Sequence, residues 1–321
     1  MSDKIRLALV GAGGMANGVH YPSLAVFDDV EMVGLCDLVP DKLQATAEKY
    51  KIERTYTDYK KMIEETAPDG VYVLMPPHHL FDICIHVLSS KLALFLEKPP
   101  GVTAEQTRQM ANCAEKNGVV SLVGFNRRYS PLMRQCKNMV LDHGGPVIQA
   151  MSSFYKWHTA GPYYNGAIDI LSCDAVHAVD ALRFIGGDVK KVVGEVSNQG
   201  MSFGTRFNAL VEFESGGAGV LMTNWRVGGR IHQFEMHGEG ISAYVNPDFH
   251  ADIYVDGATK AKRITTQKAA GGSKEPRVYY GFEGENRAFV DAVKTGQQPE
   301  TCLADAVKTM ELVDRIYHSP L

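Results

Sequence analysis

Residues 7–16 read LALVGAGGMA, a short apolar run that passes directly into a glycine-rich turn. Gly11, Gly13 and Ala16 follow the spacing G-x-G-x-x-A. In such a turn the first glycine permits a tight bend, the second lets the backbone approach a pyrophosphate, and a small third residue lets the next helix pack closely. The N-terminus of that helix adds free N–H groups and a positive dipole. The stretch therefore predicts a dinucleotide-binding strand–turn–helix unit, with a plain glycine turn as the alternative.

The chain between residues 5 and 124 alternates short apolar or β-branched runs with amphipathic segments of helix length. This rhythm is typical of a parallel sheet covered by helices on both faces. Strands are expected near 7–10, 31–36, 70–74, 92–96 and 119–123. Helices are expected near 17–25, 40–49, 60–65, 80–89 and 104–117. We predict an α/β Rossmann domain with a doubly wound parallel sheet over residues 1–125.

The pattern changes after residue 130. A helix is expected over 131–140, and short turn clusters such as 214–217 suit antiparallel pairing of the strand-like runs around them. Those runs lie at 147–155, 189–194, 209–214, 218–224, 233–238, 241–245 and 253–255. Further helices are expected at 167–184 and at 284–317, the latter broken around 295–299, and an exposed mobile loop at 265–277. We predict an α+β domain over 126–321 with a mostly antiparallel open sheet, with the option that its C-terminal helices pack back on the first domain.

Composition narrows the classes of function. A chain of 321 residues with 45% apolar content suits two domains. Its 33 basic and 37 acidic residues form no basic patch for nucleic acid or an anionic membrane. No apolar run reaches the roughly 18 residues of a membrane helix, and the start of the chain resembles no signal peptide, so a cytoplasmic location is expected. The six cysteines lack zinc-site spacing, so no metal is expected.

Asp37 ends the second predicted strand, where a carboxylate accepts hydrogen bonds from the adenosine ribose and repels a 2′-phosphate. No arginine follows it directly, which favours NAD over NADP as the cofactor. The alternative is that Asp37 caps the helix beginning at Pro40. Met75 and Pro76 follow another strand at the same edge of the sheet, and their backbone is predicted to line the nicotinamide pocket. We group His79 with them, although a solvated loop histidine is the alternative.

Residues 94–101 read LFLEKPPG, in which an apolar strand leads Glu97 and Lys98 into a proline-containing turn. The carboxyl ends of the strands face the ligand crevice in an open parallel sheet. A lysine at that position can hydrogen-bond a substrate hydroxyl or share its proton. The alternative is an exposed lysine that simply follows a strand.

Four motifs together resemble the Gfo/Idh/MocA oxidoreductase family. They are the glycine turn, the Glu97-Lys98-Pro99 turn, GFNRRY at 124–129 and FVDAVKTG at 289–296. The resemblance spans nearly the whole chain. It implies an NAD(P)-dependent oxidoreductase in which Lys98 is catalytic. It also implies a substrate domain whose open sheet mediates oligomers, so a homodimer or homotetramer formed through that sheet is expected.

The family also places an acid or base histidine on the helix that interrupts the second domain, usually with an aspartate four residues earlier. Residues 172–180 read SCDAVHAVD, so Cys173 lies four residues before His177 and Asp174 lies three before it. Either spacing puts the pair on one helix face. We expect His177 to be catalytic and Asp174 to orient it or to bind a substrate hydroxyl. The alternatives are a core histidine and an ordinary ion pair.

The last candidates are polar and aromatic. Asn126 and Arg127 leave the last predicted Rossmann strand at its ligand end, where Arg127 could anchor substrate or serve only to join the domains. Trp157 and Tyr163 belong to an aromatic cluster, and such rings pack against sugar and cyclitol faces, with core packing as the alternative. The predicted cofactor contacts are Gly11, Ala12, Gly13, Gly14, Met15, Asp37, Met75, Pro76, His79, Glu97, Lys98 and Asn126. The predicted substrate contacts are Lys98, Arg127, Trp157, Tyr163, Asp174 and His177.

These residues predict hydride transfer between NAD(H) and a ring carbinol or ketone of a sugar, sugar derivative or cyclitol. Lys98 would polarise the oxygen and His177 would exchange its proton. Two other functions remain open for the same sequence. One is an NAD-dependent glycosidase on this scaffold, and the other is a nucleotide-binding regulatory protein that catalyses nothing.

Overall fold

The computed structural model describes residues 4–319, which form two compact units. The first unit contains the chain up to Phe125 together with Phe282–Val307, and the second contains Asn126–Gly281 together with the chain from Lys308 onward. The sequence analysis predicted a domain boundary between residues 125 and 126. Residues 282–307 belong to the first unit although they follow the second along the chain. The change of unit at 307/308 falls within helix α11 (Leu303–His318).

The first unit is built on a six-stranded sheet in the order β3-β2-β1-β4-β5-β6, with every pair parallel. This confirms the predicted doubly wound Rossmann sheet. The strands are β1 (Ile5–Val10), β2 (Val30–Cys36), β3 (Thr55–Tyr56), β4 (Gly70–Val73), β5 (Ala93–Leu96) and β6 (Ser121–Val123). The sequence pattern missed β3, because a strand of two residues is too short to show a period.

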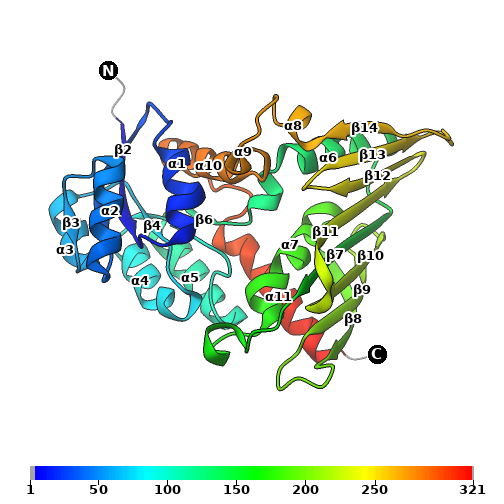
Figure 1. Ribbon diagram of the computed structural model, residues 1–321, viewed down its shortest axis with the longest axis horizontal. Coiled ribbons are helices and arrows are strands. Elements are labelled where there is room, and N and C mark those ends of the chain that lie inside the picture. The colour runs from blue at the N-terminus through cyan, green and yellow to red at the C-terminus, as the bar shows by residue number, and fades with distance from the viewer. Residues whose placement is uncertain (1–3, 320–321) are drawn as a thin grey trace. The chain divides into compact units, whose positions relative to one another are not determined.

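Helices cover both faces of this sheet (Figure 1). They are the π segment η1 (Ala16–His20), α1 (Tyr21–Leu24), α2 (Pro40–Tyr50), α3 (Tyr59–Thr66), α4 (Pro77–Ser89), α5 (Ala104–Asn117) and α10 (Phe282–Thr295). Tyr72 and Phe95 stack at 4.3 Å in the buried core, and Phe289 of α10 meets them edge-on at 5.3 and 5.7 Å. The late helix α10 is therefore part of the core of the first unit.

The strand order reverses between β1 and β4, and the turn after β1 passes close to the turn after β4. Gly11 has a φ of +104°, and a Cβ there would lie 2.4 Å from the main-chain oxygen of Leu74. A glycine is therefore required at this position both for its conformation and for its close contact. Open α/β sheets bind ligands at such a reversal, outside the carboxyl ends of the strands.

The second unit is built on an eight-stranded sheet in the order β14-β13-β12-β11-β7-β10-β9-β8. Its pairs are antiparallel except for β7 with β10, which confirms the predicted mostly antiparallel sheet. The strands are β7 (Gln149–Trp157), β8 (Val189–Ser197), β9 (Arg206–Phe213), β10 (Ala218–Asn224), β11 (Arg226–Gly238), β12 (Ile241–Asn246), β13 (His250–Val255) and β14 (Lys262–Thr265).

Helices α6 (Pro131–Gly144), α7 (Val176–Gly186) and the unit's part of α11 lie on one face of this sheet (Figure 1). Short helical segments are η2 (Asn126–Tyr129), η3 (Tyr163–Gly166), the π segment η4 (Leu171–Ala175), α8 (Thr266–Ala269) and α9 (Pro276–Tyr279).

The prediction of an exposed mobile loop at 265–277 is wrong in part. Thr265 ends β14 and accepts a hydrogen bond from the backbone of Lys268, which caps α8, and Thr266 is buried. No helix within residues 4–319 has both the length and the apolar content needed to cross a bilayer.

Candidate active site

The glycine turn of the first unit has room for a diphosphate. A Cβ added at Gly13 or Gly14 would meet no atom within 4 Å, so the space beside the turn is open. The backbone of Asn17 donates to the main-chain oxygen of Gly13 at 3.1 Å, so helical hydrogen bonding begins within the turn. Met15, also predicted to contact the cofactor, is exposed beside it. These features fit the pyrophosphate group of a dinucleotide.

Asp37 joins the glycine turn to the start of α2. One carboxylate oxygen accepts the backbone N–H of Ala12 at 2.7 Å, and the other accepts that of Val39 at 2.8 Å. Val39 is the N-cap residue of α2, so Asp37 joins the glycine turn to the start of this helix. The carboxylate is half-buried, and each of its oxygens can accept a further hydrogen bond, as a ribose diol would require.

The segment after β4 lies beside the same turn. The sulfur of Met75 would be 3.4 Å from a Cβ at Gly11. Pro76 accepts the backbone N–H of His79 at 2.9 Å and precedes α4. The ring of His79 is exposed and lies 3.9 Å from that of His78. The Met75 sulfur thus lies beside the glycine turn, whereas His79 lies on the exposed first turn of α4.

Glu97 and Lys98 follow β5 directly, and the Lys98–Pro99 peptide bond is cis. One carboxylate oxygen of Glu97 accepts the backbone N–H of Lys98 at 2.9 Å, and the other lies 2.9 Å from Nε2 of His20. Burial raises the pKa of Glu97, but the hydrogen bond from His20, the charge of Lys98 and the backbone hydrogen bond from Lys98 outweigh it, so the net direction is downward. Glu97 is therefore held as a carboxylate beneath a half-buried Lys98.

His20, Glu97 and Glu285 form a buried group with the side-chain types of a metal site, and their ligand atoms lie within 4.8 Å of one another. The imidazole of His20 and the carboxylate of Glu97 already contact each other at 2.9 Å. Asn286 contacts the other ring nitrogen of His20. His20, Glu97 and Asn286 therefore form a hydrogen-bonded cluster behind the Lys98 turn.

His177 lies in the first turn of α7, directly after the π segment η4, and is buried. Its two ring nitrogens lie 3.2 and 3.0 Å from one guanidinium nitrogen of Arg127. Arg127 also donates to the side-chain oxygen of Asn126 at 2.8 Å, and Asn126 donates to the main-chain oxygen of Tyr280 at 2.9 Å. These contacts bring three predicted site residues of the second unit together.

Asp174 lies at the end of the same π segment, and its carboxylate accepts hydrogen bonds from two side chains. Lys156 of β7 is one donor, and the hydroxyl of Tyr163 is the other at 2.9 Å. Trp225 donates to the Tyr163 oxygen at 3.0 Å. Burial and the Asp174 charge raise the pKa of Tyr163, so its hydroxyl remains a donor. The result is a half-buried group of alternating donors and acceptors, a pattern suited to hydroxyl ligands.

Trp157 is separated from this group. It follows Lys156 in β7, and adjacent strand residues point to opposite faces of a sheet. Trp157 is 58% exposed, and the guanidinium of Arg226 lies 5.1 Å from its ring centre.

His232 is a buried polar residue that the sequence did not single out. Its ring stacks on Phe154 at 4.1 Å, and neither ring nitrogen has a hydrogen-bond partner among the described residues. Burial lowers the pKa of His232, and the nearby charges of Arg127, Arg230 and Lys156 lower it further. A lone histidine within a strand gives no sequence signal of this environment. His20 and Lys156 were missed for the same reason, because their partners are distant in sequence.

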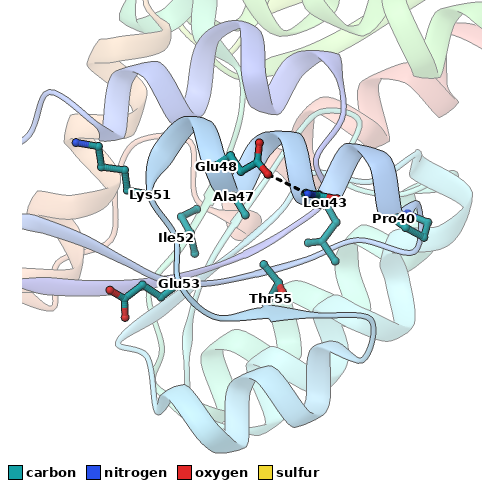
Figure 2. Close-up of a pocket in the computed structure, with 9 residues that line it drawn as sticks. Pro40, Leu43, Ala47, Glu48, Lys51, Ile52, Glu53 and Thr55 are labelled. Atoms are coloured by element: carbon teal, nitrogen blue, oxygen red, sulfur yellow. Dashed lines mark hydrogen bonds between the residues drawn. The ribbon is translucent and has the colours of Figure 1, made fainter.

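The described surface also contains a groove of about 550 Å³ along α2 (Figure 2). Leu43, Ala47 and Ile52 form part of its lining, and Glu48 and Lys51 also border it. None of the predicted site residues lines this groove, so we do not assign it to the active site.

Family models match the chain in two segments. Residues 5–125 match the oxidoreductase family with an NAD-binding Rossmann fold, and residues 145–244 match the Gfo/Idh/MocA C-terminal domain. D-glucoside 3-dehydrogenase of Escherichia coli is 32% identical over 141 residues, which span 44% of this chain and only 40% of that protein. Myo-inositol 2-dehydrogenase of Thermotoga maritima is 24% identical over 313 residues, or 92% of this chain and 90% of that protein.

A solved structure of levoglucosan dehydrogenase, in complex with NADH and levoglucosan, has the same fold with a TM-score of 0.85. The two are 18% identical, and the match covers 99% of this chain and 97% of that one. The glycine turn and the Glu97-Lys98 turn lie within the segment that matches the Rossmann model, and the second unit contains the segment that matches the C-terminal model. The chain belongs to the Gfo/Idh/MocA family of NAD(P)-dependent oxidoreductases.

Proposed function

We propose that this protein is an NAD-dependent dehydrogenase or reductase that acts on a ring hydroxyl or ketone of a sugar, sugar derivative or cyclitol. The observation that carries the proposal is Lys98, held by Glu97 at the carboxyl end of β5 in a sheet whose glycine turn has room for a diphosphate. Relatives named as inositol and glucoside dehydrogenases support the substrate class.

The proposed roles follow from the chemistry of each side chain. A bound nicotinamide supplies the carbon that accepts or donates the hydride. Lys98 donates a hydrogen bond to the substrate oxygen and stabilises its negative charge. His177 exchanges the proton of that oxygen, since an imidazole can act both as base and as acid near neutral pH. Asp174 and Tyr163 bind neighbouring hydroxyls.

The test is a panel of sugars, sugar acids and cyclitols, in which the absorbance of the reduced cofactor is followed with NAD and NADP in parallel. The proposal expects at least one ring polyol to yield NADH in proportion to product. Release of a leaving group without net NADH would instead indicate a glycosidase. Cofactor binding without turnover of any member of the panel would indicate a regulatory protein.

The cofactor preference is proposed to depend on Asp37. Replacing it with Asn removes the charge that would repel a 2′-phosphate while keeping one oxygen acceptor. We expect Asp37→Asn to move the ratio of kcat/KM for NAD and NADP by about tenfold or more toward NADP, since a charged hydrogen bond is worth roughly 1.5–3 kcal/mol. Initial rates with both cofactors measure it. Asp41→Asn, an equal charge change on the exposed first turn of α2, is the control. Equal shifts in the two variants would contradict the role of Asp37.

The sheet of the second unit is the proposed surface for self-association. Its face opposite the helices carries exposed apolar side chains from five strands, namely Val193, Leu210, Met222, Tyr244 and Tyr254. Exposed apolar side chains gathered on one sheet face are typical of protein–protein interfaces. We expect a dimer or tetramer that Leu210→Lys weakens, measured by light scattering after size-exclusion chromatography. A monomeric wild-type protein at micromolar concentration would exclude this surface as a stable interface.

A further inference from the structure

A row of buried polar side chains lies behind the Lys98 turn in the first unit. Asn286 of α10 donates through Nδ2 to the main-chain oxygen of Phe282 at 2.7 Å and lies 3.2 Å from Nδ1 of His20. Nε2 of His20 lies 2.9 Å from one oxygen of Glu97, whose other oxygen accepts the backbone N–H of Lys98 at 2.9 Å. The row joins α10 to the backbone of Lys98.

The donors and acceptors of this row have one consistent arrangement. A main-chain oxygen only accepts, so Asn286 must present its NH2 group to Phe282, and the second hydrogen of that group points to Nδ1 of His20. Nδ1 therefore accepts, and a neutral imidazole that accepts through Nδ1 carries its proton on Nε2. That proton faces the carboxylate of Glu97, which only accepts. The orientation of one amide thus sets every later hydrogen bond in the row.

Packing fixes His20 in the row. His20 is the last residue of the π segment η1, and its ring meets Phe95 at 5.1 Å and Phe282 at 5.9 Å, both edge to face. The side chains of His20 and Asn286 are completely buried. Water cannot readily replace a partner at such a site, so loss of either residue leaves a buried polar group unsatisfied.

We propose that His20 and Asn286 are positioning residues for Lys98, which they hold through the carboxylate of Glu97. The inference rests on the catalytic role of Lys98 in the proposed function. Both residues act on the position of the Lys98 backbone, and a displacement of about 1 Å can lower turnover by about 100-fold.

Conservative and apolar variants distinguish positioning from packing. A glutamine at position 20 can still donate a hydrogen bond to the carboxylate of Glu97. A leucine there occupies a volume similar to that of histidine but has no hydrogen-bond donor. We expect His20→Leu and Asn286→Leu each to lower kcat by about 10- to 100-fold. The KM for NAD should change less than about threefold in both variants. His20→Gln should retain several-fold more activity than His20→Leu. A packing role alone predicts that Leu is tolerated at least as well as Gln. Arg287→Gln, which breaks an ion pair of the same helix with Asp29, is the matched control and keeps wild-type kcat.

A second measurement needs no substrate. Reductive methylation with ¹³C-formaldehyde labels lysine side chains, and the resonance missing from Lys98→Met identifies Lys98. We expect this resonance to shift in His20→Leu and Asn286→Leu, in NAD-bound protein, and to stay in place in Arg287→Gln. An unmoved Lys98 resonance, or equal kcat for His20→Leu and His20→Gln, overturns the positioning role. Full turnover by Lys98→Met would instead overturn the proposed function, so the two failures are distinguishable.

Discussion

Replacing Lys98 with Met is expected to lower kcat by about 10³-fold, within the 10²- to 10⁴-fold range that a positioned proton-transfer or polarising group contributes. Methionine has a similar length and flexibility but no charge and no N–H donor. The backbone N–H of Lys98 donates a hydrogen bond to the carboxylate of Glu97 at 2.9 Å, and this bond does not involve the Lys98 side chain. The substitution should therefore remove the chemistry while leaving the turn in place. Steady-state rates with the best substrate of the polyol panel measure this effect.

The affinity of Lys98→Met for NADH shows whether the substitution affects catalysis or cofactor binding. The dissociation constant for NADH, followed by its fluorescence, should change less than about threefold in Lys98→Met, because the diphosphate site lies at the glycine turn. Lys60→Met, an exposed substitution on α3, should retain wild-type kcat and affinity. If Lys98→Met lost NADH binding and kept its turnover at saturating cofactor, Lys98 would be a binding residue and the proposed mechanism would be wrong.

Replacing Arg128 with Met is expected to lower the free energy of unfolding of the second unit by about 3–5 kcal/mol, because it leaves a buried charge without its partner. The guanidinium of Arg128 makes two hydrogen bonds to Asp180 of α7, at 2.9 and 2.6 Å, and both side chains are buried. Thr309 donates to the same carboxylate at 2.9 Å. Urea unfolding followed by circular dichroism measures the loss.

An exposed pair of the same geometry is the matched control. Arg263 also makes two hydrogen bonds to one carboxylate, that of Asp252, each at 2.7 Å, but its side chain is 59% exposed. Arg263→Met should cost only about 0–1 kcal/mol. The double variant Arg128→Met with Asp180→Leu should recover much of the lost stability, because no unpaired charge remains. Equal losses for the buried and the exposed variant would refute the argument from burial.

Local sequence patterns predicted both sheets and most of the strands and helices. The glycine turn and the LFLEKPPG segment are each contiguous, so the residues that cause the structure are neighbours in the chain. The break at 295–299 was also visible, and it separates α10 from α11 as expected. The pattern failed at 265–277, where the hydrogen bond from Lys268 to Thr265 and the burial of Thr266 produce α8 in a segment of polar and small residues.

Side-chain environments depended on contacts between distant residues. The π segment η1 contains His20 and the π segment η4 contains Asp174, yet no residue type in the sequence signals a π turn. Asp174 was expected to act with its helix neighbour His177, and the structure adds Lys156 and Tyr163 as its hydrogen-bond donors. β11 pairs with β7 and places the buried His232 ring on Phe154, where it has no hydrogen-bond partner within residues 4–319.

The amino-acid pattern of residues 7–16 and 94–101 was sufficient to predict a dinucleotide fold and a lysine at the end of a strand, because turns and strands depend on short-range sterics and apolar periodicity. It was not sufficient to show what holds that lysine. His20 and Glu97 are 77 positions apart, and Asn286 is 266 positions from His20. They meet because apolar burial packs α10 against the parallel sheet, and that long-range packing places the amide, the imidazole and the carboxylate in one row.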